Sequence, residues 1–348
     1  MEKDERQTHT ARRKSEHIDI CLHGDVRGQN VTTGFEKYRL RHTALPEIDF
    51  SEISLAGSFL GKRIKVPLVV SSMTGGTPEA AEINERLATV AEQRGWAMGL
   101  GSMRAALEEP ELVATFQVRK QAPTIPIFAN LGAVQLNYGY GLDHCRRAVQ
   151  LVEADGLVLH LNSLQEVFQP EGNTNFKGLL SKIEQLCHTL DVPVGVKEVG
   201  WGIGGELAAA LAARGVQFID VAGAGGTSWS QVEKYRSRDP VRSLAAESFA
   251  GWGLPTATCI REVHTRVREV TVIGSGGIQN GVEAAKALAL GADLVGVGRP
   301  LLAAAVHSRA ALSRVCARIE LELQTAMFGV GASDVQQLKT GNYLVECD

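Results

Sequence analysis

The stretch TVIGSGGIQNGVEAAKALALGADLVGVGRP, residues 271–300, contains the repeating unit from which the fold can be predicted. It opens with a short apolar run that ends in glycines, continues with a segment of helical period, and closes with a second apolar run that again stops at glycine. A strand, a helix and a second strand in this order are typical of a parallel sheet, because the helix carries the chain back to start the next strand. The stretch therefore predicts an α/β protein.

The same alternation extends over the chain from about Val66 onward. Strands are expected at 66–73, 96–103, 126–132, 156–162, 193–200, 218–226, 271–277 and 293–300. Helices are expected at 78–95, 109–122, 142–154, 176–190, 205–215, 256–270, 281–292 and 309–331. Eight strand and helix pairs favour a closed (β/α)8 TIM barrel, since an open doubly wound sheet needs fewer repeats and usually has a glycine fingerprint after its first strand.

The remaining segments are expected to decorate a single domain. Residues 1–65 predict an N-terminal arm followed by a short hairpin or irregular cap, which belongs to the same domain as the barrel of residues 66–348. No linker rich in Pro, Gly or Ser divides the chain. Residues 228–253 are long for a loop between a strand and its helix, so we expect a lid or cap there.

Composition excludes some partners. The 348 residues include 36 basic and 39 acidic ones, a net charge of −3, which gives no broad field for nucleic acid or an anionic membrane. A small-molecule ligand, with any anionic group held locally, is the expectation. The six cysteines are scattered without zinc spacing, and the charged N-terminus lacks the apolar core of a signal peptide. We therefore expect reduced thiols, no membrane segment and a cytoplasmic location.

Polar residues collect where several predicted strands end. In GLVLHLN, residues 156–162, alternation sends His160 and Asn162 to the face opposite the leucines. The same parity places Ser102 with Arg104 after the second strand and directs Asn130 inward on the third. Since TIM-barrel active sites are built at the carboxyl ends of the strands, these side chains predict an active site there.

Three further features suggest what this site binds. In GVKEVG, either Lys197 or Glu198 must face inward, and we favour Lys197 as a cation beside a bound cofactor. The predicted strands six, seven and eight end in GAGGTS, GSGGIQNG and GVGRP, where glycine lets backbone N–H groups approach phosphate oxygens. The basic stretch RRKSEH, residues 12–17, would by itself predict a solvated tail. It becomes part of the site only if the arm folds over the barrel mouth.

Taken together, these motifs resemble one family, the type 2 isopentenyl-diphosphate delta-isomerases, which are flavin enzymes. The resemblance runs from RKSEHIDICL to GADLVGVGRPLL and covers nearly the whole chain. HLNSLQEVFQPEG, residues 160–172, together with KEVG, residues 197–200, carries it most specifically, whereas the glycine turns are common to many FMN barrels.

The resemblance implies an activity and its requirements. It implies interconversion of isopentenyl diphosphate and dimethylallyl diphosphate in isoprenoid biosynthesis, with reduced FMN, Mg2+, and NADPH as the reductant. The reaction has no net redox change, so the flavin would act as an acid/base or electronic stabiliser. A homotetramer or homo-octamer is also implied.

The same resemblance implies residue roles. The implied catalytic residues are Gln165, His160, Asn162 and Lys197, with Gln165 limited to positioning or proton relay because an amide does not titrate. The implied substrate-binding residues are Arg13, Lys14, His17, Ser102, Arg104, His160, Asn162 and Gln165. The implied cofactor-binding residues are Ser72, Met73, Thr74, Ser102, Asn130, Lys197, Thr227, Gly276, Gly277, Gly298 and Arg299. Glu166 is the implied Mg2+ ligand.

Two positions depart from the family pattern. Met103 stands where the family commonly has Gln, and Ala222 stands where a serine is frequent. The first puts a contact from the middle of GSMR in doubt, and the second removes a hydrogen bond to the flavin.

Other functions remain open from the sequence alone. An FMN-dependent α-hydroxy-acid oxidase would share the last strands, but its catalytic histidine after a late strand is missing from GAGGTSW. An aldolase could use Lys197 as a Schiff-base nucleophile and would be colourless. A non-catalytic phosphate-binding protein would not need polar residues from at least four strand ends.

Overall fold

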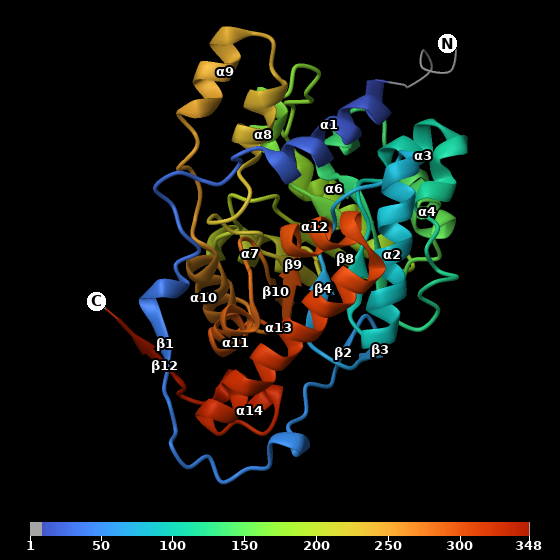
Figure 1. The fold of residues 1–348 in the computed structure, drawn as a ribbon. Coiled ribbons are helices and arrows are strands. Elements are labelled where there is room, and N and C mark those ends of the chain that lie inside the picture. The colour runs from blue at the N-terminus through green and yellow to red at the C-terminus, as the bar shows by residue number, and fades with distance from the viewer. Residues whose placement is uncertain (1–8, 348) are drawn as a thin grey trace.

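A computed structural model describes residues 9–347 and shows a closed barrel of eight parallel strands (Figure 1). The strands pair in the order β10-β11-β4-β5-β6-β7-β8-β9, so each is next to its sequence neighbour and the sheet closes between β11 and β4. Their bounds are β4 Leu68–Val70, β5 Ala97–Gly99, β6 Ile127–Gly132, β7 Gly156–His160, β8 Val194–Lys197, β9 Phe218–Asp220, β10 Thr271–Gly274 and β11 Leu294–Val297. The prediction of a (β/α)8 barrel is confirmed.

An outer layer of helices covers the barrel. The helices that match predicted segments are α2 Pro78–Arg94, α4 Leu142–Leu151, α6 Leu179–Thr189, α7 Gly205–Ala212, α10 Thr256–Arg266, α11 Gly281–Ala289 and α13 Arg309–Val330. Helix α12, Arg299–His307, was not predicted, because its first two residues were assigned to the preceding strand. Pro300 stands in its first turn, where a missing N–H costs nothing.

The predicted helix at 109–122 is wrong. The chain forms the short helix α3, Arg104–Glu108, and then the 3-10 helix η3, Pro110–Thr115. Proline disfavours helical dihedrals in the residue before it, and Glu109 is extended, with φ −132° and ψ 97°. The α-helix therefore ends at Glu108, and the chain restarts as a tighter turn.

The barrel interior is sealed at the amino ends of the strands. Phe128 and Phe218 from the barrel meet Phe59 from the hairpin β2 Gly57–Phe59 and β3 Lys62–Ile64, with ring centroids 5.4 to 6.0 Å apart. Val158 belongs to this interior cluster, whereas Leu157 and Leu159 pack in the core under the helices. The alternation predicted for this strand is thus observed, and the open end of the barrel lies at the carboxyl ends of the strands.

That open end is covered by the arm and by the long segment after β9. Helix α1, His9–His23, packs on α8, Trp229–Arg236, and on α12 (Figure 1). Residues 228–253 contain α8 and α9, Pro240–Glu247, and both contact α5, Ser163–Phe168. The arm therefore folds over the mouth.

Short elements complete the described chain. Strand β1, Tyr38–Leu40, pairs antiparallel with β12, Leu344–Glu346, so the arm also meets the C-terminal segment. The other elements are η1 Phe35–Lys37, η2 Phe50–Glu52, η4 Ala133–Asn137 and α14 Val335–Thr340. Between residues 9 and 347, no helix is both long and apolar enough to cross a membrane.

Candidate active site

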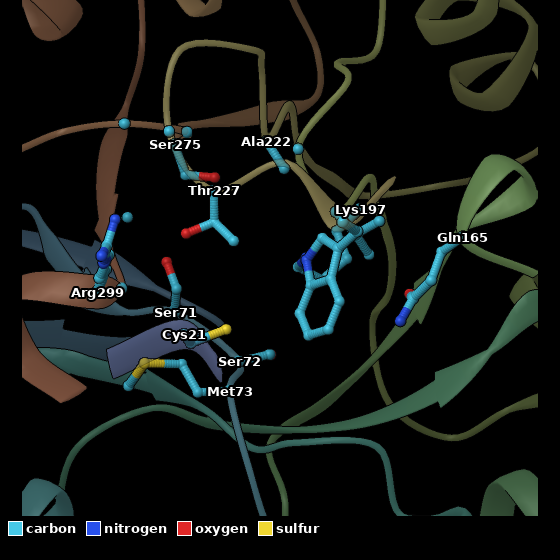
Figure 2. Close-up of a pocket in the computed structure, with 18 of the residues that line it drawn as sticks. Cys21, Ser71, Ser72, Met73, Gln165, Lys197, Ala222, Thr227, Ser275 and Arg299 are labelled. Atoms are coloured by element: carbon cyan, nitrogen blue, oxygen red, sulfur yellow. The ribbon is translucent and has the colours of Figure 1, made fainter. Parts of the chain in front are cut away.

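A cavity of about 1070 Å³ lies at the mouth of the barrel, between the strand ends, α1 and α8 (Figure 2). All the site residues predicted from the sequence line it: Arg13, Lys14, His17, Ser72, Met73, Thr74, Ser102, Arg104, Asn130, His160, Asn162, Gln165, Glu166, Lys197, Thr227, Gly276, Gly277, Gly298 and Arg299. Segments far apart in the sequence are therefore brought to one place. Their individual roles remain predictions.

Helix α1 supplies cations to this cavity. The Lys14 ammonium donates to the backbone oxygen of Ser102 at 3.0 Å and lies 4.8 Å from the ring centroid of Phe116. Burial, together with the nearby charge of Arg13, lowers the pKa of Lys14 to about 7. Arg13 itself pairs with Glu171 at 3.6 Å. Arg13, Lys14 and His17 thus belong to the cavity wall, unlike the solvated tail that the composition of this stretch alone predicts.

Glu233 on α8 joins the arm to the predicted catalytic segment, a role that no motif in the sequence indicates. Its carboxylate, which has no exposed surface, accepts from Gln165 at 3.0 Å and from Arg236 at 2.5 Å, and contacts His17 at 3.0 Å. Burial raises the pKa of Glu233, but the hydrogen bond and charge of His17 and the charge of Arg236 lower it to about 2. A buried carboxylate therefore stays ionised next to Gln165.

His160 is held as a neutral group. Its Nδ1 lies 2.9 Å from the side-chain oxygen of Asn130, on the neighbouring strand. Burial, and then the positive charges of Lys197 and Lys14, lower the pKa of His160 to about 3. At neutral pH the imidazole can hydrogen bond to a ligand without adding charge to the cavity.

Glu166 offers the cavity a hard oxygen ligand. Its carboxylate accepts from the side chain of Asn162 at 2.8 Å and from the backbone N–H of Asn173 at 2.5 Å, and the residue is only 7% exposed. The Oδ1 of Asn162 is buried and, within residues 9–347, has no hydrogen-bond partner. No group of three or more His, Cys, Asp or Glu side chains in the described chain could hold a metal by itself. These donors fit Mg2+, which commonly uses one or two carboxylates and completes its shell with substrate phosphates and water.

The choice left open between Lys197 and Glu198 is settled by the geometry. Lys197 lines the cavity, while Glu198 turns away and accepts four backbone N–H groups of the following turn, from Val199 to Gly202, at 2.5 to 3.1 Å. Asp220, opposite Lys197 in register on β9, also lines the cavity and accepts from Ser275 at 2.5 Å. No sequence pattern indicates a role for Asp220, because it lies within an apolar run that is typical of a buried strand.

On the other side of the cavity, the glycine turns meet the N-terminus of α12. Gly276 has φ +107°, and a Cβ placed there would lie 2.1 Å from the backbone oxygen of Gly223, so only glycine fits. Arg299 heads α12 and has no ion-pair partner among the residues that the structure describes. The Ser72 hydroxyl is also buried, and it has no hydrogen-bond partner among residues 9–347. A helix N-terminus, a free guanidinium and close-approach glycines fit a phosphate group.

Figure 2 shows how these groups divide the cavity. Arg299, Ser71 and Met73 lie at one side, and Lys197 and Gln165 lie at the other.

The two positions that depart from the family pattern differ in consequence. Met103 is fully buried in the core and is not part of the cavity lining. Ala222 does line the cavity, and it takes a left-handed φ of +39°.

Comparison with known proteins places the barrel in a class. The sequence model of the family FMN-dependent dehydrogenase matches residues 153–345. Two solved structures share the fold: a mandelate oxidase variant with an FMN adduct, 18% identical with a TM-score of 0.64 over 94% of both chains, and a lactate oxidase of Pediococcus acidilactici, 16% identical with a TM-score of 0.68 over 97% of this chain and 94% of that one. The fold is that of the FMN-dependent oxidase barrels.

Curated relatives narrow the class to one family. The isopentenyl-diphosphate delta-isomerase of Oceanobacillus iheyensis is 54% identical over 94% of both chains. Those of Nostoc sp., 51% identical over 95% of this chain and 94% of that one, and of Synechocystis sp., 52% identical over 94% of both, are similar to a comparable degree. The chain belongs to the isopentenyl-diphosphate delta-isomerase family.

Proposed function

We propose that this chain interconverts isopentenyl diphosphate and dimethylallyl diphosphate, using reduced FMN and Mg2+ with no net redox change. The observation that carries the proposal is that Glu166 and Lys197 line one cavity, next to the cationic arm. A magnesium-bound diphosphate and a flavin could therefore share that cavity. Membership of the isomerase family supports the same reaction.

In this proposal the glycine turns and α12 hold the phosphate of FMN. The residues that would do so are Gly276, Gly277, Gly298 and Arg299, with Ser72, Met73, Thr74, Ser102, Asn130, Lys197 and Thr227 along the rest of the cofactor. When bound and reduced, FMN would supply acid/base or electronic stabilisation, with NADPH as the expected reductant. The ammonium of Lys197, placed beside the ring, would favour an anionic reduced form by charge proximity.

The opposite part of the cavity would receive the substrate diphosphate. This group carries about three negative charges, which need local compensation because the protein as a whole is slightly acidic. Arg13, Lys14 and Arg104 provide cations at the cavity wall, with Ser102 beside them, and Glu166 would hold Mg2+ against the phosphate oxygens. His17 would act mainly by docking the arm on Glu233.

Neutral polar groups remain for the hydrocarbon end. His160 is uncharged at neutral pH, and Asn162 and Gln165 cannot titrate. The Gln165 amide is oriented by two contacts, since its nitrogen donates to Glu233 and its oxygen accepts from Asn162 at 3.3 Å. We therefore assign Gln165 to positioning or proton relay at the alkene. A cationic side chain here would oppose a carbon that becomes positively charged.

The competing activities make different demands. A 2-hydroxy-acid oxidase needs the histidine after a late strand, but the histidines that line the described cavity are His17 on α1 and His160 on β7. An aldolase needs Lys197 as a nucleophile and no flavin. The two oxidase structures are similar at a level that shows the fold alone.

One experiment separates these functions. FMN-loaded protein, reduced without oxygen, is incubated with isopentenyl diphosphate and Mg2+, and the products are identified by chromatography. The isomerase proposal expects dimethylallyl diphosphate. Reduction of the bound flavin by lactate or mandelate, with no isomer formed, would favour an oxidase. Protein that purifies without flavin, and is trapped by borohydride on Lys197 with a sugar phosphate, would favour an aldolase.

The assembly and location are also proposals. We expect a homotetramer or homo-octamer, as the family resemblance implies, and a cytoplasmic location. Light scattering on the eluted protein tests the first of these.

A further inference from the structure

Phe116 is a fully buried aromatic residue that contacts the arm. It caps the end of η3, and its ring face lies 4.8 Å from the ammonium of Lys14. The same ammonium donates to the backbone oxygen of Ser102. A cation over a ring face is attracted by the quadrupole of the ring, most strongly where water is excluded.

The ring is fixed by the loop that follows β4. A Cβ placed on Gly75 would lie 2.0 Å from a carbon of the Phe116 ring, so the backbone of the loop packs directly on the ring. The N–H of Gly76 donates to the hydroxyl of Thr115 at 2.8 Å, and Asn84 joins the backbone oxygens of Thr74 and Thr115 at 3.2 and 2.9 Å. These bonds tie η3, and with it the backbone that carries the ring, to the loop.

Lys14 needs such a partner more than an exposed lysine would. Its surroundings are dry, and Arg13 adds a like charge, so both effects favour loss of its proton. Within the described chain no carboxylate forms an ion pair with Lys14. The ring of Phe116 and the oxygen of Ser102 are the contacts that stabilise the ammonium form.

We infer that Phe116 is a positioning residue for the diphosphate site: its ring holds the Lys14 ammonium in place at the cavity wall. Phe116 does not line the cavity, so it acts through Lys14. The inference rests on the proposed function, in which Lys14 binds the substrate diphosphate.

The variant Phe116→Leu removes the ring but keeps an apolar side chain. We expect the KM for isopentenyl diphosphate to rise roughly two- to thirtyfold, the range that a cation over a ring supports. The kcat should change by less than about twofold, since the loss is in binding. Phe116→Met, with a longer side chain, repeats the test if the leucine variant folds poorly.

A double-mutant cycle with Lys14→Met distinguishes positioning from general loosening of the fold. If Phe116 acts through Lys14, the leucine substitution has no further effect on KM once Lys14 is gone. An equal increase in KM in both backgrounds, or an unchanged KM in the single variant, would overturn the inference. Phe218→Leu is the matched control, because Phe218 is equally buried but packs with Phe59 and Phe128 at the sealed end of the barrel.

Failure of the proposed function would look different. The same cycle is measured as the Kd of inorganic pyrophosphate with Mg2+, by calorimetry on FMN-loaded protein. If wild-type protein binds pyrophosphate but makes no isomer, the proposed reaction is wrong and the role of Phe116 is still tested by the cycle. If wild-type protein binds no pyrophosphate, both are wrong.

Discussion

Gln165 on α5 and Glu233 on α8 form a buried hydrogen bond of 3.0 Å, in which the amide donates to the carboxylate. The same carboxylate oxygen contacts His17 of the arm. Closure of the arm and orientation of Gln165 thus depend on one side chain. Glu233, which is not part of the cavity lining, therefore orients Gln165, which is.

The first prediction concerns this carboxylate. Glu233→Gln keeps the shape but removes the charge that His17, Gln165 and Arg236 share. We expect kcat to fall about tenfold or more, because a hydrogen bond to a charged group contributes about 1.5 to 3 kcal/mol. FMN content should be unchanged. Glu247→Gln, which removes a carboxylate paired with Lys234 in the same covering segment, is the control. Equal kcat for the two variants would refute the role.

The second prediction concerns pH and His160. The pKa of His160 is lowered from 6.5 to about 3 in the folded protein, so between these pH values the imidazole is protonated in the unfolded chain but not in the folded one. The buried neutral imidazole therefore makes its full contribution to the free energy of unfolding above pH 6.5, and this contribution is lost as the pH falls towards 3. Between pH 7.5 and 5.5 the loss is about 1.4 kcal/mol, one pKa unit's worth.

Urea unfolding of the FMN-loaded protein at these two pH values measures this loss. His160→Gln should reduce the difference in free energy of unfolding by about that amount. His23→Gln, on the exposed side of α1, should leave it unchanged. An identical pH dependence in all three proteins would show that His160 does not carry the effect.

The third prediction concerns Glu166. Glu166→Gln keeps the hydrogen bond from Asn162 but loses the anionic metal ligand. Loss of a group that only supports a metal ligand typically lowers metal affinity about 10- to 100-fold, so loss of the ligand itself should lower the apparent affinity for Mg2+ by at least that much. Activity should recover in part at high Mg2+, while the flavin spectrum stays that of the parent. A titration of activity against Mg2+ measures both. An unshifted titration would place the metal elsewhere.

The fourth prediction concerns Gly276. An alanine there would meet the backbone oxygen of Gly223 and carry a side chain at φ +107°, so the turn must move. We expect protein that purifies with little flavin absorbance. Gly139→Ala is the control, since it has a similar left-handed φ of +89° but no atom within 4 Å. Loss of flavin in both variants would indicate general backbone strain.

The sequence predicted the barrel and most of the site, for a physical reason. Strand alternation correctly directs Asn130 and His160 inward, and the position of the strand ends places Asn162 and Arg104 at the mouth, although both lie beyond their strands, at the starts of α5 and α3. The prediction of a helix at 109–122 is wrong because it follows the helical spacing of apolar residues and neglects the effect of Pro110, which disfavours helical dihedrals at Glu109.

The contacts of Glu233 and Asp220 could not have been predicted in this way. Glu233 lies on a helix whose sequence, WSQVEKYR, reads as solvent-exposed, and it is buried only because α1 and α5 fold against α8. Asp220 lies directly opposite Lys197 in strand register, although Lys197 comes 23 residues earlier in the sequence. Such pairs depend on tertiary packing, which local pattern does not contain.

The most direct measurement counts product against reducing equivalents. FMN-loaded protein is reduced once with dithionite, freed of excess reductant without oxygen, and given excess isopentenyl diphosphate and Mg2+. We predict many molecules of dimethylallyl diphosphate per flavin, with the flavin still reduced at the end. No isomer, or at most one product per flavin with the flavin oxidised, would contradict a redox-neutral isomerase.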